Sequence, residues 1–368
     1  MKRGLGLLLA ALLAVGVVAA VVLGGKGPDG SDGANVTSAT AVTSVNGLIG
    51  SEKAPFFADQ RVKDALARHG ISVDVTAVGS RDMSTSPALG QTDFAFPSSR
   101  PAADKVNATR EAAAVFEPFH SPLAVATFEP VRALLQSAGV VRKEGEHWAF
   151  NMTKYYELAA KGTRWDALPG NTAYRASKAV LVTTTDLRRS NSAAMYLALV
   201  AYVAGGKNLV ATAAQADALV PKVAPFFLAQ GYTGRSTEEP FEDYLSAGMG
   251  KTPMVLIYEA QYLGRQIAGD GSIASNMVLM YPTPDVVTQH TLLAYTDGAK
   301  RLGEVLQNDA ELARLAAIYG FRPRQPQVFA EVLQQAGVAQ PPELVDIVEP
   351  PTYGVLERLL VGVEKLYG

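Results

Sequence analysis

The sequence predicts an α/β fold, because short strand-like runs alternate with amphipathic helical segments along most of the chain. The run at 71–78 carries apolar residues at every second position, as a strand with one buried face does. The segment before it, 55–69, carries its apolar residues near helical spacing instead. Residues 44–368, about 325 positions, are enough for two lobes of ordinary domain size.

The same two periodicities give the order of the elements. Strands are expected at 45–49, 71–78, 93–96, 123–127, 179–183, 254–258 and 277–281. Helices are expected at 55–69, 131–138, 193–204, 291–307, 309–319 and 353–367. Gly70 should end the first helix and Pro97 the third strand, because both residues interrupt regular structure.

The N-terminal segment indicates the cellular location of the protein. Lys2 and Arg3 precede an uncharged run at 4–25, and about 20 apolar residues suffice for a helix that crosses a bilayer. Because positive residues stay on the cytoplasmic side, we expect 1–25 to be a single transmembrane anchor and the rest to be extracytoplasmic. A cleaved secretory signal is the alternative, and it would export the same part. Residues 26–43, small and polar, should form a flexible tether.

Composition excludes several classes of function. The formal net charge of −2 and the lack of a basic block argue against nucleic acid as a partner. The absence of cysteine excludes disulfides, thiolate metal sites, a cysteine nucleophile and a lipidated N-terminal cysteine. The four histidines are scattered without metal-ligand spacing, and the serine nucleophile motif of hydrolases is missing. We therefore expect no metal, no cofactor and no enzymatic activity.

Candidate ligand-binding residues follow the expected strands. In open α/β sheets, ligands bind beyond the carboxyl ends of the strands, where helix N-termini present free backbone N–H groups. Five loops at such places carry polar or charged side chains, and we expect them to line one cleft. These loops supply Ser51, Glu52, Lys53, Ser80, Arg81, Ser98, Ser99, Arg100, Asn191, Ser192, Tyr258 and Glu259. For any one loop alone, a helix cap or a surface ion pair is the alternative reading.

Several stretches of the chain carry a family resemblance. They lie at 50–53, 56–57, 79–83, 96–100, 121–127, 155–156, 164–165, 190–196, 241–245, 253–259, 281–284 and 320–323. Two of them read Phe96-Pro-Ser-Ser-Arg100 and Ser190-Asn-Ser-Ala-Ala-Met-Tyr196. With these stretches the chain resembles bacterial extracellular solute-binding proteins of the two-lobed type II class, which contains phosphate-, sulfate- and molybdate-binding proteins. Within that class it resembles a membrane-anchored subgroup.

The resemblance implies a Venus-flytrap architecture, in which two lobes close on a solute. Lobe one would comprise 44–123 and 283–368, and lobe two 124–282. Two crossovers, near 122–126 and 281–284, would form the hinge. The spanning helix replaces the cleaved signal or lipidated cysteine that is usual in the class, and this argues against free diffusion between membrane and transporter.

The resemblance also implies a function. The protein would capture a small polar solute between its lobes and present it to a membrane transporter or another membrane complex. The charges of Lys53, Arg81 and Arg100 favour an anion over a cation, whereas Glu52 and Glu259 oppose an anion. A second hypothesis is a membrane-anchored sensor or assembly subunit that uses the fold for protein–protein contact. An enzyme is a third and disfavoured hypothesis.

The anchor is testable by fractionation. The full-length chain should be recovered in the membrane pellet, with residues 44–368 accessible to protease added from outside, because the charged end stays in the cytoplasm. Recovery of a shortened, freely soluble exported product would show that the segment is a cleaved signal instead.

Overall fold

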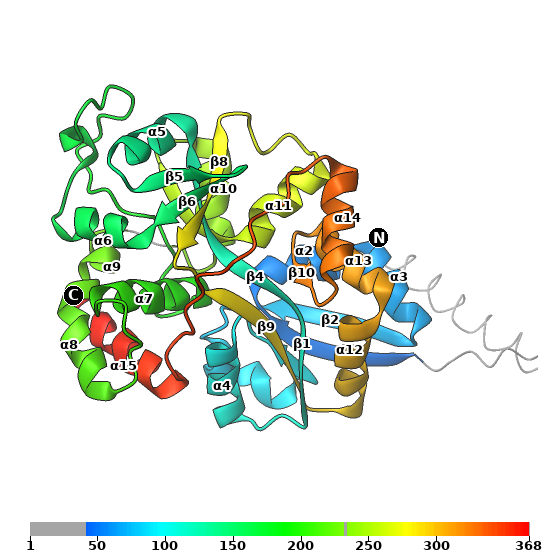
Figure 1. Ribbon diagram of the computed structural model, residues 1–368. Coiled ribbons are helices and arrows are strands. Elements are labelled where there is room, and N and C mark those ends of the chain that lie inside the picture. The colour runs from blue at the N-terminus through cyan, green and yellow to red at the C-terminus, as the bar shows by residue number, and fades with distance from the viewer. Residues whose placement is uncertain (1–41, 232–233, 368) are drawn as a thin grey trace, which may run out of the picture. The chain divides into compact units, whose positions relative to one another are not determined.

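The computed structural model describes residues 42–231 and 234–367 (Figure 1). The predicted anchor at 1–25 and most of the predicted tether at 26–43 lie outside the described residues. Within the described ranges, no helix has both the length and the apolar character that a membrane span requires.

Ten strands and fourteen helices are described, along with four short 3-10 helices. The strands are β1 (Thr43–Ile49), β2 (Ile71–Ala77), β3 (Phe94–Phe96), β4 (Ala114–Phe128), β5 (Val141–Glu144), β6 (His147–Asn151), β7 (Met254–Tyr258), β8 (Met277–Thr283), β9 (Val287–Ala294) and β10 (Arg322–Pro323). The first helices are α2 (Ala54–Ala58), α3 (Gln60–Arg68), α4 (Arg100–Thr109), α5 (Glu129–Ser137), α6 (Met152–Ala160), α7 (Asn191–Ala204) and α8 (Ala213–Val223). The later ones are α9 (Pro225–Leu228), α10 (Glu238–Ala247), α11 (Glu259–Ala268), α12 (Asp297–Asn308), α13 (Ala310–Ile318), α14 (Pro326–Ala336) and α15 (Tyr353–Glu364). The 3-10 helices are η1 (Ser51–Lys53), η2 (Met83–Thr85), η3 (Pro87–Gln91) and η4 (Trp165–Ala167).

Two sheets share the long strand β4 (Figure 1). Its first part pairs with β9 and β10, in a sheet with the order β2-β1-β3-β9-β4-β10. Its last part pairs with β7 on one side and β8 on the other, in a sheet with the order β7-β4-β8-β6-β5. We call the first sheet and its helices (43–122 and 287–336) lobe one, and the second with its helices (123–283 and 353–364) lobe two.

The core of lobe one lies on both faces of its sheet, because neighbouring residues of a strand point to opposite sides. Phe94 and Leu292 pack with α2, α3, α12 and α13 on one face. Ala95 and Leu293, the next residue in each strand, pack with α4 on the other face. The parallel strands β1, β2 and β3 therefore end at one edge of a doubly covered sheet, where loops are free to present polar groups.

The core of lobe two surrounds α7. This helix is apolar on nearly all sides, and only Tyr202 and Ala204 of its residues are not fully buried. A helix that is hydrophobic all round is stable only inside a protein, and α7 accordingly lies among α6, α8, α15 and β7. Its N-terminal residue Asn191 faces the boundary with lobe one, where Ser99 contacts it.

Three predicted elements differ from the structure. The segment 179–183 is not a named strand, although Thr183 exchanges two backbone hydrogen bonds with β7, of 3.0 and 2.8 Å. The predicted helix at 55–69 is broken by Asp59, whose side chain caps α3 by accepting from the Arg61 N–H. The predicted helix at 291–307 begins only at Asp297, because the preceding residues form β9 and Thr296 caps α12.

The C-terminal helix α15 packs on lobe two, whereas the predicted lobe boundaries assign it to lobe one. Residues 283–368 were all expected in lobe one. Leu356, Leu359 and Leu360 of α15 instead belong to the core of lobe two, packed beside α7 and α8. The amphipathic pattern predicted this helix but not its partner, because an apolar stripe fits either lobe. The chain therefore crosses between the lobes at β4, between β8 and β9, and again between α14 and α15.

Gly320 provides a test of packing between the lobes. It has φ +79°, and a Cβ there would lie 2.3 Å from the carbonyl oxygen of Ala260 in α11. Gly337 has a similar φ of +67° with nothing within 4 Å. In urea unfolding, Gly337→Ala should lower the free energy of unfolding by about 1 kcal/mol, the usual penalty of a left-handed conformation. Gly320→Ala should lower it by about 3 kcal/mol or more, since it adds a clash with backbone.

Equal effects of the two substitutions would contradict this close approach of the turn after α13 to α11.

Candidate functional site

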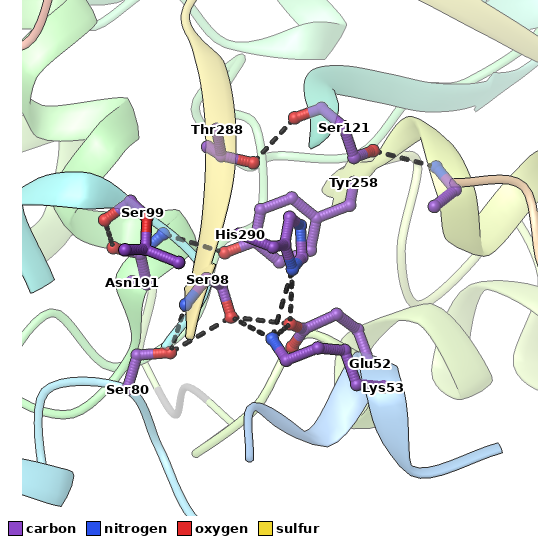
Figure 2. Close-up of polar contacts among 12 residues, drawn as sticks. Glu52, Lys53, Ser80, Ser98, Ser99, Ser121, Asn191, Tyr258, Thr288 and His290 are labelled. Carbon is purple, nitrogen blue, oxygen red and sulfur yellow. Dashed lines mark hydrogen bonds and ion pairs between the residues drawn. The ribbon is translucent and has the colours of Figure 1, made fainter. Parts of the chain in front are cut away.

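Loops from both lobes meet in one buried polar cluster (Figure 2). From lobe one come the loops after β1, β2 and β3, and from lobe two come the N-terminus of α7 and the end of β7. The residues that these loops bring together are Glu52, Lys53, Ser80, Ser98, Ser99, Asn191 and Tyr258. All seven are residues that the sequence predicted, and that they bind a ligand stays a prediction.

Lys53 lies at the centre of the lobe-one part of this cluster. Its side chain is fully buried, and its Nζ donates to Glu52 Oε1 at 2.5 Å and to Ser98 Oγ at 3.1 Å. The third contact of Nζ is Nδ1 of His290 at 3.1 Å (Figure 2). An ammonium group has three N–H donors, so these three neighbours match it one for one.

Ser98 links the lysine to the loop after β2. Its hydroxyl donates to Glu52 Oε1 at 2.5 Å and lies 3.0 Å from the hydroxyl of Ser80. The Ser98 N–H also donates to Ser80 Oγ, at 3.2 Å. One donor and two acceptor positions of the Ser98 hydroxyl are therefore occupied by groups of the protein itself.

A second chain of hydrogen bonds crosses from one lobe to the other. Ser99, at the N-terminus of α4, donates to Oδ1 of Asn191 at the N-terminus of α7. Nδ2 of Asn191 in turn donates to the hydroxyl of Tyr258 at 3.0 Å. Ser99 and Asn191 thus join two helix N-termini, which are the parts of an α/β protein best suited to hold a polar or anionic group.

The charges of the cluster are balanced within it. Burial lowers the pKa of Lys53, while the carboxylate of Glu52 acts in the opposite direction. Burial, followed by the nearby charge of Lys53, holds the pKa of His290 well below its ordinary value. His290 is therefore neutral near pH 7, and its Nδ1 can accept a hydrogen bond from Lys53. Its Nε2 is buried without a hydrogen-bond partner among the described residues.

Two cavities adjoin Glu52. The one between the lobes is lined by Ser51, Ser80, Asn191 and Tyr258 and leaves about 20 Å³ of free space. This is room for about one water molecule. A larger cavity of about 260 Å³, also lined by residues of both lobes, lies on the other side of Glu52, between α11 and the start of α2. The protein's own side chains therefore fill the space beside Asn191 and Tyr258, and a solute larger than water requires the lobes to separate there.

Five predicted site residues lie outside this hydrogen-bonded cluster. Arg81 points to Glu357 of α15, and Arg100 pairs with Glu117 beside a separate cavity of about 650 Å³ on lobe one. Glu259 is fully buried but forms a two-bond ion pair with Arg322, at 2.7 Å for each bond. Ser192 contacts other hydroxyls of its own loop, and Ser51 borders the small cavity.

Sequence reasoning did not find His290. It lies in β9, where no strand was predicted, and so no strand-end rule pointed to it. No local signal marks the segment as a strand, because four consecutive polar residues at 288–291 are followed by three apolar ones at 292–294, without alternation. Within 42–231 and 234–367, no group of three or more His, Asp or Glu side chains is arranged to hold a metal ion.

The fold has counterparts among solved structures, although no protein-family model and no curated protein matches the chain. The sulfate-binding protein SubI from Mycobacterium tuberculosis H37Rv is 15% identical with a TM-score of 0.55, and the alignment covers 88% of this chain and 99% of SubI. The apo ferric ion-binding protein A from Pasteurella haemolytica is 12% identical with a TM-score of 0.54, over 88% and 97% of the two chains. The periplasmic binding protein AfuA from Actinobacillus pleuropneumoniae, with bound fructose-6-phosphate, is 11% identical with a TM-score of 0.52, over 88% and 97%.

These likenesses establish the fold. The chain has the two-lobed α/β fold of periplasmic solute-binding proteins, which confirms the predicted fold class of the globular part. At such low identity they do not establish the solute. Sulfate, ferric ion and sugar phosphate differ in charge and size, so the fold leaves the chemistry of the cleft to the residues described above.

One half-buried histidine, His120, and one buried histidine, His290, make stability depend on pH. Burial, then the charge of Arg322, lowers the pKa of His120 to about 4. Between about pH 7.5 and about pH 5.5, unfolded histidines take up protons while His120 and His290 stay neutral in the folded state, so folding loses about 1 kcal/mol for each. Urea unfolding should show this loss, and His120→Gln should lose less stability than the parent over the same interval.

Above about pH 7.5 both states are neutral, so the parent and His120→Gln should then keep a constant difference in stability. If the two proteins lose the same stability between pH 7.5 and pH 5.5, His120 is protonated in the folded state.

Proposed function

We propose that the protein is an extracytoplasmic solute-binding protein. It captures a small polar solute between its two lobes and presents it to a membrane transport partner. The observation that carries this proposal is the convergence of five strand-end and helix-start loops, from both lobes, on one buried cluster that includes Ser98, Asn191 and Tyr258. A site divided between two lobes binds its ligand best when they close, so solute binding is coupled to lobe closure.

The solute is recognised chiefly by hydrogen bonds. Each of the three cations that favoured an anion faces a carboxylate: Lys53 faces Glu52, Arg81 faces Glu357, and Arg100 faces Glu117. Their attraction for an anion is therefore largely cancelled. The groups that remain to hold a polar solute are hydroxyls, the amide of Asn191 and the N-termini of α4 and α7. An anion binds only where these hydrogen-bond donors stabilise its negative charge.

The N-terminal segment completes the proposal. The apolar run at 4–25 would keep the protein at the cell membrane as a single-pass anchor, with 44–368 on the outer side. This is the arrangement of the membrane-anchored subgroup that the sequence resembles. A tethered binding protein stays near one partner, so its transporter or other membrane complex would lie in the same membrane.

One observation favours a second function, that of a sensor or assembly subunit which uses this fold for protein–protein contact. The lobes touch directly through Ser99 and Asn191, and the cavity beside these two residues leaves about 20 Å³ of free space. A form that closes on its own side chains can present a fixed surface to another protein. The presence or absence of adjacent transporter permease and ATPase genes would separate the two functions.

Solute binding is tested by thermal shift on the purified full chain. The panel contains inorganic phosphate, sulfate, molybdate, amino acids, sugars, sugar phosphates and amines. A true solute should raise the melting temperature by mass action. Calorimetry on each hit should show that Asn191→Ala weakens binding about tenfold or more, because one hydrogen bond to a polar ligand contributes about 1 kcal/mol and Asn191 offers two groups.

Arg100→Ala is the matched control, since Arg100 lies beside the separate cavity of lobe one and is exposed. It should bind each hit as the parent does. If no compound of the panel raises the melting temperature, the second function is favoured. If Arg100→Ala loses binding and Asn191→Ala does not, the solute occupies the cavity on lobe one.

A further inference from the structure

Helix α15 is fixed firmly to lobe two. Leu356, Leu359, Leu360 and Val363 are buried in the core of that lobe. The side chain of Val220 in α8 also packs against the backbone of α15, since a Cβ on Gly362 would lie 2.4 Å from its Cγ2. A helix packed through four buried side chains moves with the lobe that holds it.

A second contact fixes α15 to lobe two at its surface. Arg358 donates to both carboxylate oxygens of Asp217 in α8, at 2.6 and 2.8 Å. The exposed fraction of the side chain is 57% for Arg358 and 50% for Asp217. An exposed pair of this kind adds little to stability, but it shows which way Arg358 points.

The neighbouring residue Glu357 points to lobe one. Its carboxylate accepts from both terminal nitrogens of Arg81, in the loop after β2. It also accepts from Nζ of Lys105 in α4, at 3.3 and 3.4 Å for its two oxygens. One carboxylate of α15 thus holds two cations of the other lobe, and the side chain of Arg81 is only 7% exposed.

Backbone contacts between the lobes surround this ion-pair cluster. The Arg81 N–H donates to the carbonyl oxygen of Arg189 at 3.2 Å, and Arg81 Nε lies 3.4 Å from the carbonyl oxygen of Arg188. A Cβ on Gly79 would lie 2.7 Å from the Arg189 oxygen. The loop after β2 therefore touches the loop before α7 directly, and opening of the lobes must break these contacts together with those of Glu357.

The segment that leads into α15 is bound to the crossover between β8 and β9. Asp285 donates its N–H to the carbonyl oxygen of Asp346 at 2.9 Å, and its own carbonyl oxygen accepts from the Val348 N–H at 2.8 Å. The chain thus leaves lobe one after α14, passes the hinge, and ends in a helix that belongs to lobe two.

We propose that α15 is a latch: Glu357, carried by lobe two, holds the lobes closed by pairing with Arg81 and Lys105 of lobe one. Opening separates one carboxylate from two cations, so the latch sets how often the cleft is accessible. This inference does not depend on the identity of the solute, or on whether the protein binds one.

The distance between the lobes tests the latch. The chain has no cysteine, so Lys63→Cys in α3 and Lys161→Cys after α6, both exposed, place one spin label in each lobe of the full chain. Double electron–electron resonance without added solute then gives the distance distribution. Glu357→Gln keeps the size of the side chain and removes its charge. It should raise the ratio of open to closed forms about tenfold, the change expected when a charge-assisted hydrogen bond of ordinary strength is lost.

Arg358→Gln is the matched control, because it removes a charge from the same helix but breaks a contact within lobe two only. It should leave the distribution as in the parent. Lys105→Gln, which removes one of the two cations, should give a smaller shift in the same direction as Glu357→Gln. Thermal melting of each variant confirms that it is folded.

Identical distributions for the parent, Glu357→Gln and Lys105→Gln would overturn the proposal. So would an equal shift for Glu357→Gln and Arg358→Gln, because it would mean that loosening of α15 on lobe two, and not the pairing across the lobes, causes the opening.

Discussion

The architecture depends on β4, a single strand that belongs to both sheets. Because Pro122 pairs with β9 and Leu123 with β7, the boundary between the lobes falls within one continuous backbone. Ser121 is buried at this boundary, where its hydroxyl accepts from the Ala260 N–H at 3.1 Å and its carbonyl oxygen accepts from Thr288 (Figure 2). The lobes are therefore joined by hydrogen-bonded structure, and relative motion is confined to bending at a few residues.

The sequence was most informative about the parts governed by local rules. Alternation predicted 71–78 and the strand ends supplied Ser98 and Asn191, because the place of a loop after a strand follows from the order of elements alone. The helix at 353–367 was predicted from its amphipathic pattern, which is also a local property. What a local rule describes is an element and its ends. The predicted elements differ from the structure at 55–69, which Asp59 divides, at 179–183, which is not a named strand, and at 291–296, where apolar residues fit both periods.

Partners could not be predicted in the same way. Arg81, Arg100 and Glu259 stand at strand ends as expected, but each turns to an oppositely charged residue of another helix or strand. Glu357 lies 276 residues from Arg81, and Arg322 lies 63 residues from Glu259. Nothing in the local sequence pattern joins either pair. The choice between a ligand and an internal partner is made by tertiary packing, which a single sequence does not display.

The pairing of Glu52 with Lys53 has a consequence for selectivity. The carboxylate is itself an anion, covalently attached beside the cation that a dissolved anion would seek. It acts as an intramolecular competitor, and tethered groups compete at effective concentrations on the order of millimolar or more. Both side chains are buried in the closed form, so dissolved salt screens their attraction only weakly. An anion that replaced this carboxylate beside Lys53 would have to gain additional hydrogen bonds to offset the loss.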